Sequence, residues 1–159
     1  VQKHRVIPAS SRSRVRVDQM PNVLLRFARC CEPLPGEDII GYITHGRGIT
    51  IHARRCPNIH KMEPERILMA NWEPEDRPVY PVRIGFSSHH HPQLLQDIVK
   101  ILNTHDALIL SQKTKMSKRK DKVSGEFVVE VTDLDELRSI LMELDQIPGM
   151  IKTERLLSR

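Results

Sequence analysis

Aromatic side chains are scarce in this sequence: Phe, Tyr and Trp make up 4% of its 159 residues, with a single Trp. Any hydrophobic core must therefore be built mainly from Leu, Ile and Val. The scarcity disfavours proteins that bind single strands by stacking bases on a platform of aromatic rings. Contact with nucleic acid, if it occurs, is expected through phosphate groups.

Long apolar runs are also missing. No stretch approaches the roughly eighteen apolar residues that can span a bilayer, and the first residues carry no signal-peptide pattern. We therefore expect a cytoplasmic protein with no membrane partner. The chain does not begin with Met, which suggests a piece of a longer protein.

Cysteine occurs three times, and an odd number argues against a disulfide framework. Cys30 and Cys31 are adjacent, and Cys56 follows four residues after His52. Three thiolates and one imidazole suit a closed, structural zinc site. From the spacing alone an alternative stays open, in which the thiols are buried small hydrophobes or redox-sensitive groups. No acid/base pattern accompanies them, so we predict no catalytic residue in this chain.

Positive charge is concentrated in two segments. Residues 1–61 contain eleven Lys and Arg against four Asp and Glu, and residues 113–122 contain six against one. Such surfaces attract polyanions such as RNA, although a run of charge can equally be a solvated face. The second segment is expected at the tip of a β-hairpin, where Lys118, Arg119 and Lys120 can rest on phosphates.

The pattern along the chain predicts two modules. Residues 1–21 form a flexible basic lead-in to which no fold is assigned. Residues 22–73 form a cysteine-rich, zinc-finger-like module, a small antiparallel sheet with one short helix. Its expected strands are 23–28, 39–44, 49–52 and 67–72, with a helical turn at 57–62. Residues 74–79 are an acidic, proline-rich linker.

Residues 80–159 form the second module. A strand is expected over 80–86, a helix over 94–102, a β-hairpin from 107–116 and 126–131, a second helix after Asp133, and a last strand over 150–157. This order, β-α-β-β-α-β, is the ferredoxin-like arrangement with both helices on one face of a four-stranded sheet. The fold class of the whole chain is therefore α+β.

A run of three histidines, His89, His90 and His91, lies in the loop between the first strand and first helix of the second module. A ligand in that loop would meet a helix N-terminus. The alternative is an ordinary polar loop, which is the commoner reason for a histidine run.

The cysteine region carries a resemblance to a known family. Residues 26–44 read RFARCCEPLPGEDIIGYIT, residues 46–52 read GRGITIH, and residues 56–58 read CPN. This pattern closely resembles the cysteine module of the Rel/Spo family, which is also called the zinc-finger or ribosome-intersubunit domain. In that family an ACT domain follows, and residues 80–157 look like one.

The resemblance implies the regulatory C-terminal region of a GTP pyrophosphokinase-type parent. Such a parent makes, and often hydrolyses, guanosine tetra- and pentaphosphate (ppGpp) in the stringent response, with catalytic domains upstream. Family members use this region to dock on the ribosome, with contacts to ribosomal RNA and tRNA, and to restrain the catalytic domains.

The resemblance also implies which residues matter. It assigns a structural zinc site to Cys30, Cys31, His52 and Cys56. The candidates for RNA contact are Arg47, Arg54 and Arg55 in the cysteine module and Lys118, Arg119 and Lys120 in the hairpin. The resemblance further implies that ACT domains can pair as homodimers and bind an amino acid, for example a branched-chain amino acid. The corresponding loop here contains His90, His91 and Gln93, with Gln93 at the position of the usual glycine.

Overall fold

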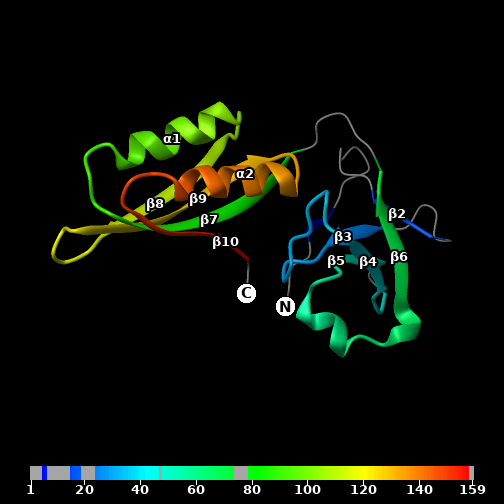
Figure 1. The fold of residues 1–159 in the computed structure, drawn as a ribbon. Coiled ribbons are helices and arrows are strands. Elements are labelled where there is room, and N and C mark those ends of the chain that lie inside the picture. The colour runs from blue at the N-terminus through cyan, green and yellow to red at the C-terminus, as the bar shows by residue number, and fades with distance from the viewer. Residues whose placement is uncertain (1–4, 7–14, 19–23, 47, 74–78, 158–159) are drawn as a thin grey trace. The chain divides into compact units, whose positions relative to one another are not determined.

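The computed structural model describes residues 5–6, 15–18, 24–46, 48–73 and 79–157 (Figure 1). The chain divides into two compact units, Val79–Leu156 and the remainder of the chain. The division falls at the end of the acidic segment that the sequence marks as a linker.

The first unit is built on a six-stranded sheet with strand order β1-β3-β5-β4-β6-β2. Its strands are β1 (Arg5–Val6), β2 (Val15–Val17), β3 (Leu25–Phe27), β4 (Ile39–Ile43), β5 (Ile49–Ala53) and β6 (Ile67–Trp72). All neighbours are antiparallel except β3 and β5, which run parallel. The predicted small sheet, with its β4–β5 hairpin, is confirmed, and its expected antiparallel pairing is corrected for β3 and β5.

The parallel pair begins at a close approach of two backbones. Gly48 has φ +82°, and a Cβ at this position would lie 2.4 Å from the carbonyl oxygen of Leu24. That same carbonyl accepts a hydrogen bond of 3.0 Å from the N–H of Ile49. Glycine is therefore required here, because a side chain would push β5 away from β3.

Two strands come from the segment expected to be a flexible lead-in, and that expectation is corrected for Arg5–Val6 and Val15–Val17. The remainder of 1–14 and residues 19–23 lie outside the described residues. Val15 and Val17 are buried while Arg16 is exposed, and β2 pairs with β6. A strand of three residues is too short to show a clear alternation of apolar and polar residues in the sequence. It is recognised only in the structure, where it pairs with β6.

Two short 3₁₀-helices, η1 (Pro57–Lys61) and η2 (Pro64–Arg66), connect β5 to β6. The predicted helical turn at 57–62 corresponds to η1. Proline stands at the start of each helix, where its fixed φ is favourable and its missing N–H is not needed. Neither helix buries a residue. Because neither has a face that packs against the core, packing does not favour a longer α-helix at either position.

The second unit has the predicted β-α-β-β-α-β order, which is confirmed. Its elements are β7 (Tyr80–His89), α1 (Leu94–Thr104), β8 (Ile109–Met116), β9 (Lys122–Val131), α2 (Leu134–Asp145) and β10 (Met150–Leu156). The sheet has the order β10-β7-β9-β8, and every neighbouring pair is antiparallel. Both helices lie on the same side of this sheet (Figure 1). Within the described residues, no helix is both long and apolar enough to cross a bilayer.

The core of the second unit lies between this sheet and its helices. Its largest buried side chains are Val82, Ile84, Phe127 and Val129 from the strands, Leu94, Ile98 and Leu102 from α1, and Leu137 and Ile140 from α2. Alternate strand residues and every third or fourth helix residue supply these contacts. The rings of Phe86 and Phe127 add a tilted aromatic pair with centroids 5.7 Å apart.

Asp133 caps the start of α2. The Asp133 side chain accepts a hydrogen bond of 2.8 Å from the N–H of Glu136. The carboxylate of Glu136 accepts from the N–H of Thr132 at 2.9 Å. In a standard capping box that second bond would come from the cap residue itself. The cap fixes where the chain leaves β9.

Candidate metal centre

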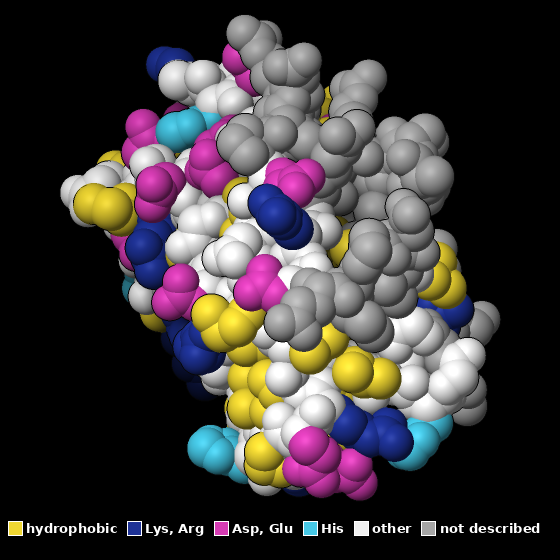
Figure 2. Space-filling model, turned by 90° about the vertical axis from the view of Figure 1, so that its right-hand side faces the viewer, with side chains coloured by type: hydrophobic (Ala, Val, Ile, Leu, Met, Phe, Trp, Pro, Cys, Tyr) yellow, Lys and Arg dark blue, Asp and Glu magenta, His cyan; other side chains and the backbone are white. Residues whose placement is uncertain are grey.

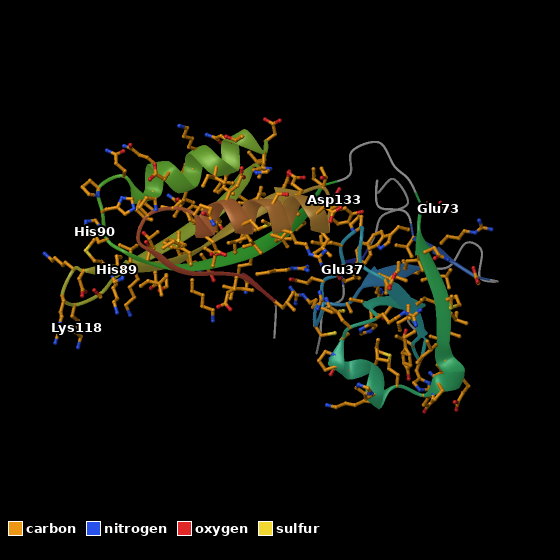
Figure 3. All side chains as sticks on the ribbon, in the orientation of Figure 1. Glu37, Glu73, His89, His90, Lys118 and Asp133 are labelled. Atoms are coloured by element: carbon orange, nitrogen blue, oxygen red, sulfur yellow. The ribbon has the colours of Figure 1, made fainter. Side chains whose placement is uncertain are left out.

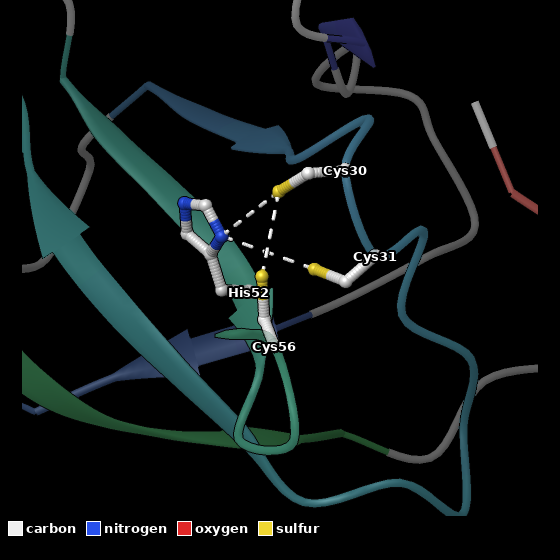
Figure 4. A group of neighbouring side chains, drawn as sticks. All are labelled: Cys30, Cys31, His52 and Cys56. Atoms are coloured by element: carbon white, nitrogen blue, oxygen red, sulfur yellow. Dashed lines mark hydrogen bonds between the residues drawn. The ribbon is translucent and has the colours of Figure 1, made fainter. Parts of the chain in front are cut away.

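Cys30, Cys31, His52 and Cys56 converge in the first unit (Figure 4). The two adjacent cysteines follow β3, His52 lies in β5, and Cys56 comes directly before η1. Their ligand atoms all lie within 4.8 Å of one another. The structure thus brings together the four side chains that the sequence singles out.

A turn lets both adjacent cysteines face the same point. In a strand, neighbouring side chains would point to opposite faces. Here the N–H of Glu32 donates to the carbonyl of Ala28 at 3.0 Å, and Glu32 has φ +42°. The Sγ atoms of Cys30 and Cys31 consequently lie 3.5 Å and 3.8 Å from His52 Nδ1.

The other two side chains are positioned by β5 and its end. His52 is only 7% exposed, and its backbone is paired with Ile40 of β4. After β5 the chain turns back, with the N–H of Cys56 donating to the carbonyl of Ala53 at 2.9 Å. This turn places Cys56 Sγ 3.5 Å from Cys30 Sγ.

These separations fit a tetrahedral ion. Zinc bonds of about 2.3 Å to sulfur and about 2.0 Å to nitrogen imply roughly 3.8 Å between two sulfur ligands and roughly 3.6 Å between sulfur and nitrogen. The Sγ atoms of Cys30 and Cys56 are 3.5 Å apart, those of Cys30 and Cys31 lie 3.5 Å and 3.8 Å from His52 Nδ1, and all four ligand atoms lie within 4.8 Å of one another. Four protein ligands would close the coordination shell, as in structural rather than catalytic zinc sites.

The surroundings of the cluster are apolar and protected from water. Cys31, Ala28 and Ala53 have no exposed surface, and Cys56 is 2% exposed. Burial raises the pKa of the Cys31 thiol, and it raises the pKa of Cys56 as well. The N–H of Ala53 donates to Cys31 Sγ at 3.2 Å and partly opposes this effect. A divalent cation would therefore have to displace protons from these thiols, which links binding to pH.

Comparison with known proteins identifies both units. Residues 15–73 match the family model of the RelA/SpoT RIS domain, and residues 77–155 match that of the ACT domain. The chain belongs to the RelA/SpoT family. The cysteine cluster lies in the RIS domain, and the β-α-β-β-α-β unit is the ACT domain.

Curated relatives are GTP pyrophosphokinases. That of Myxococcus xanthus is 32% identical over 152 residues, covering 96% of this chain and 20% of the relative. That of Escherichia coli (strain K12) is 31% identical over 146 residues, covering 90% of this chain and 20% of the relative. This chain spans about a fifth of the length of these relatives. It matches a RIS domain followed by an ACT domain and corresponds to the C-terminal part of such enzymes.

One similar solved structure is the ACT domain from GTP pyrophosphokinase of Chlorobium tepidum. It is 15% identical and has a TM-score of 0.44, covering 49% of this chain and 99% of that chain.

The arginines predicted to contact RNA in the RIS domain have different surroundings. Arg47 lies outside the described residues. Arg54 is exposed, whereas the guanidinium of Arg55 donates to the carbonyl of Cys31 and to the carboxylate of Glu37. No sequence pattern indicates Glu37, which is 18 residues from Arg55. Acidic and basic side chains are interspersed on the face drawn in Figure 2.

The basic hairpin of the ACT domain is located as predicted, between β8 and β9. Lys118, Arg119 and Lys120 are all exposed in the turn, and Figure 3 shows Lys118 at the end of the hairpin. The Ser117 hydroxyl donates to the Asp121 carboxylate at 2.7 Å and lowers the pKa of Asp121. The one acidic group of the tip is therefore engaged in a hydrogen bond with Ser117.

The expectation that the histidine run lies wholly in the loop between β7 and α1 is corrected, because His89 is the last residue of β7 and only His90 and His91 lie in the loop. The N–H of His90 donates to the carbonyl of Asp121 at 2.8 Å, and His91 Nε2 is buried without a hydrogen-bond partner in the described part of the chain. Gln93, at the N-cap of α1, is exposed and has φ −94°. Any residue can adopt that backbone conformation, so glycine is not required here. The metal-ligand group found among the described residues is the cysteine cluster, not this run.

Proposed function

We propose that this chain is the cytoplasmic, non-catalytic regulatory region of a stringent-response enzyme that makes or hydrolyses ppGpp. In this proposal zinc holds the RIS domain together, and the region docks on the ribosome through ribosomal RNA and tRNA. It also restrains the catalytic domains of the parent. Support comes from the RIS and ACT matches and from relatives named GTP pyrophosphokinase.

The observation that carries the RNA part of the proposal is the basic hairpin tip. Its three central cations are exposed, and its one carboxylate is hydrogen-bonded to Ser117. A projecting tip of this kind can rest on phosphates, and each phosphate that it neutralises releases counterions. The scarcity of aromatic residues favours phosphate contact over base stacking. In the RIS domain, exposed Arg54 is the proposed counterpart, together with Arg47 and Arg55.

Charge reversal tests this role. We expect Lys118→Glu combined with Lys120→Glu to weaken binding to purified ribosomes by about tenfold or more. The slope of the logarithm of the binding constant against the logarithm of the salt concentration should also become shallower, by about 0.9 for each phosphate that the tip no longer neutralises. Co-sedimentation at several KCl concentrations measures both quantities.

A matched control separates local contact from net charge. Lys100 and Arg138 are exposed residues of α1 and α2, so Lys100→Glu with Arg138→Glu changes the net charge by the same amount. If both pairs weaken binding equally, or if neither does, the hairpin is not the RNA contact.

A second proposed role is amino-acid sensing by paired ACT domains. It is favoured by His91 Nε2, a buried polar atom without a partner in the described residues, in a loop that meets the N-terminus of α1. With His90 and Gln93 it offers polar groups for a branched-chain amino acid. We expect calorimetric heats with valine or isoleucine, and a His91→Ala variant should lose them. An absence of heat in the wild type would refute this role.

A further inference from the structure

Arg55 lies between the two segments that supply thiols to the metal centre. Its backbone directly precedes Cys56, and its Nη2 atom donates to the carbonyl oxygen of Cys31 at 3.0 Å. The same nitrogen is 3.2 Å and 3.3 Å from the two carboxylate oxygens of Glu37. One side chain thus joins the end of β5 to the β3–β4 loop.

Glu37 is itself held in place. Its side chain is only 6% exposed, whereas that of Arg55 is 46% exposed. The Glu37 backbone is fixed from two sides: its N–H donates to the carbonyl of Leu34 at 3.0 Å, and its carbonyl accepts from Trp72 Nε1 at 3.0 Å. The carboxylate therefore presents a fixed acceptor that orients the guanidinium.

We propose that Arg55 is a positioning residue of the metal centre, oriented by Glu37. This inference rests on the proposed zinc site. By holding the Cys31 carbonyl, Arg55 fixes the turn that contains Cys30 and Cys31, which we call the paired-cysteine turn. Both thiols then stay at ligand distance from His52 and Cys56. Residues that orient metal ligands in this way influence metal affinity without touching the ion.

The paired-cysteine turn is the part of the site that needs such support. Glu32, immediately after Cys31, has φ +42°, a left-handed conformation that non-glycine residues keep only when surrounding contacts hold it. The bond from Arg55 to Cys31 acts one residue before this position. Without it, the turn is free to relax and to rotate a sulfur away from the cluster.

The chemistry of the contact requires arginine rather than any cation. A guanidinium is planar, so the two N–H bonds of Nη2, the nitrogen that makes all three contacts, are held in fixed directions toward the carbonyl and the carboxylate. A lysine ammonium is a point charge on a flexible stem. We therefore expect Arg55→Lys to keep the charge but to lose much of the positioning.

Metal titration of the whole chain tests the role. Reduced, zinc-free protein is titrated with cobalt(II), whose visible absorption reports tetrahedral thiolate coordination, and zinc affinity is measured by competition with a chromophoric chelator. We expect Arg55→Ala to weaken zinc binding by about 10- to 100-fold, with Arg55→Lys intermediate. Arg54→Ala, at the exposed neighbouring position, should bind zinc with the same affinity as the wild type.

Thermal melting distinguishes positioning from general stability. A purely structural role lowers the melting temperature equally with and without zinc, whereas positioning reduces the increment that zinc adds. Glu37→Gln, which keeps the shape of the side chain, provides a second variant if Arg55→Ala does not fold.

The possible outcomes separate the two proposals. If wild-type protein binds neither cobalt nor zinc, the zinc proposal fails and this inference fails with it. If the wild type binds, and the folded Arg55 or Glu37 variants bind as tightly as Arg54→Ala, this inference alone is overturned.

Discussion

Replacing Cys31 with Ser is expected to abolish the zinc-dependent stability of the RIS domain. Cys31 has no exposed surface, and its Sγ lies 3.8 Å from His52 Nδ1. In zinc-finger peptides the binding of structural zinc supplies about 10–16 kcal/mol, and this energy is available for folding. The domain has a small core, so removing one thiolate should remove much of its stability.

The measurement is thermal unfolding with zinc and with chelator. We expect chelator to lower the RIS transition of the wild type by about 10 °C or more, because each kcal/mol corresponds to roughly 4–8 °C in a domain of this size. Cys31→Ser should melt near the temperature of the chelated wild type, with or without zinc.

Ala53→Ser is the matched control. It places a hydroxyl at a buried neighbouring position without removing a ligand, so any destabilisation should leave the zinc increment intact. The prediction would be overturned if the wild-type chain contained no zinc on elemental analysis and if chelator left its melting temperature unchanged. That result would favour the other interpretation of the spacing, a cluster of buried thiols.

The second large effect is expected in the ACT domain. Phe127→Ala removes a side chain that is 2% exposed and packs against the ring of Phe86. Truncation of a buried Phe costs about 3–5 kcal/mol, because transfer energy is lost and a cavity remains. The ACT transition should therefore fall by roughly 12 °C or more, measured by calorimetry.

Val128→Ala is the neighbouring control. Val128 is only half-buried and points to the opposite face of β9, since successive strand residues alternate. Its truncation should have a much smaller effect. Zinc affinity should stay unchanged in Phe127→Ala, because the two units have separate cores; a loss of zinc binding in this variant would contradict that separation.

The order of elements and the core of the ACT domain could be predicted because their signals are local, whereas β7 and β9 are longer than the expected 80–86 and 126–131. Val82, Ile84 and Phe86 alternate along β7 and are all buried. Helical spacing marks Leu94, Ile98 and Leu102 in α1 in the same way. Periods of two and of 3.6 depend only on neighbouring residues, so they are visible without a structure.

The edge strands of the RIS sheet, β1 and β2, could not be predicted, and neither could the parallel pairing of β3 with β5. β2 pairs Val15 with Trp72, and β3 pairs Leu25 with Ile49 in parallel. These partners are distant in sequence and have no repeating spacing. A short strand finds its place because an unpaired sheet edge needs hydrogen-bond partners, and that need arises only once the central strands have formed.

By itself, the sequence determined the order of the elements in the ACT domain, the core stripes of that domain and the types of residue available for a metal. Tertiary structure decided that Cys30 and Cys31 face the same point, and that Arg55 meets Glu37 and the Cys31 carbonyl. The reason is physical. Secondary structure follows from short-range sterics and periodicity, whereas a site follows from contacts between segments that only the folded chain brings within bonding distance.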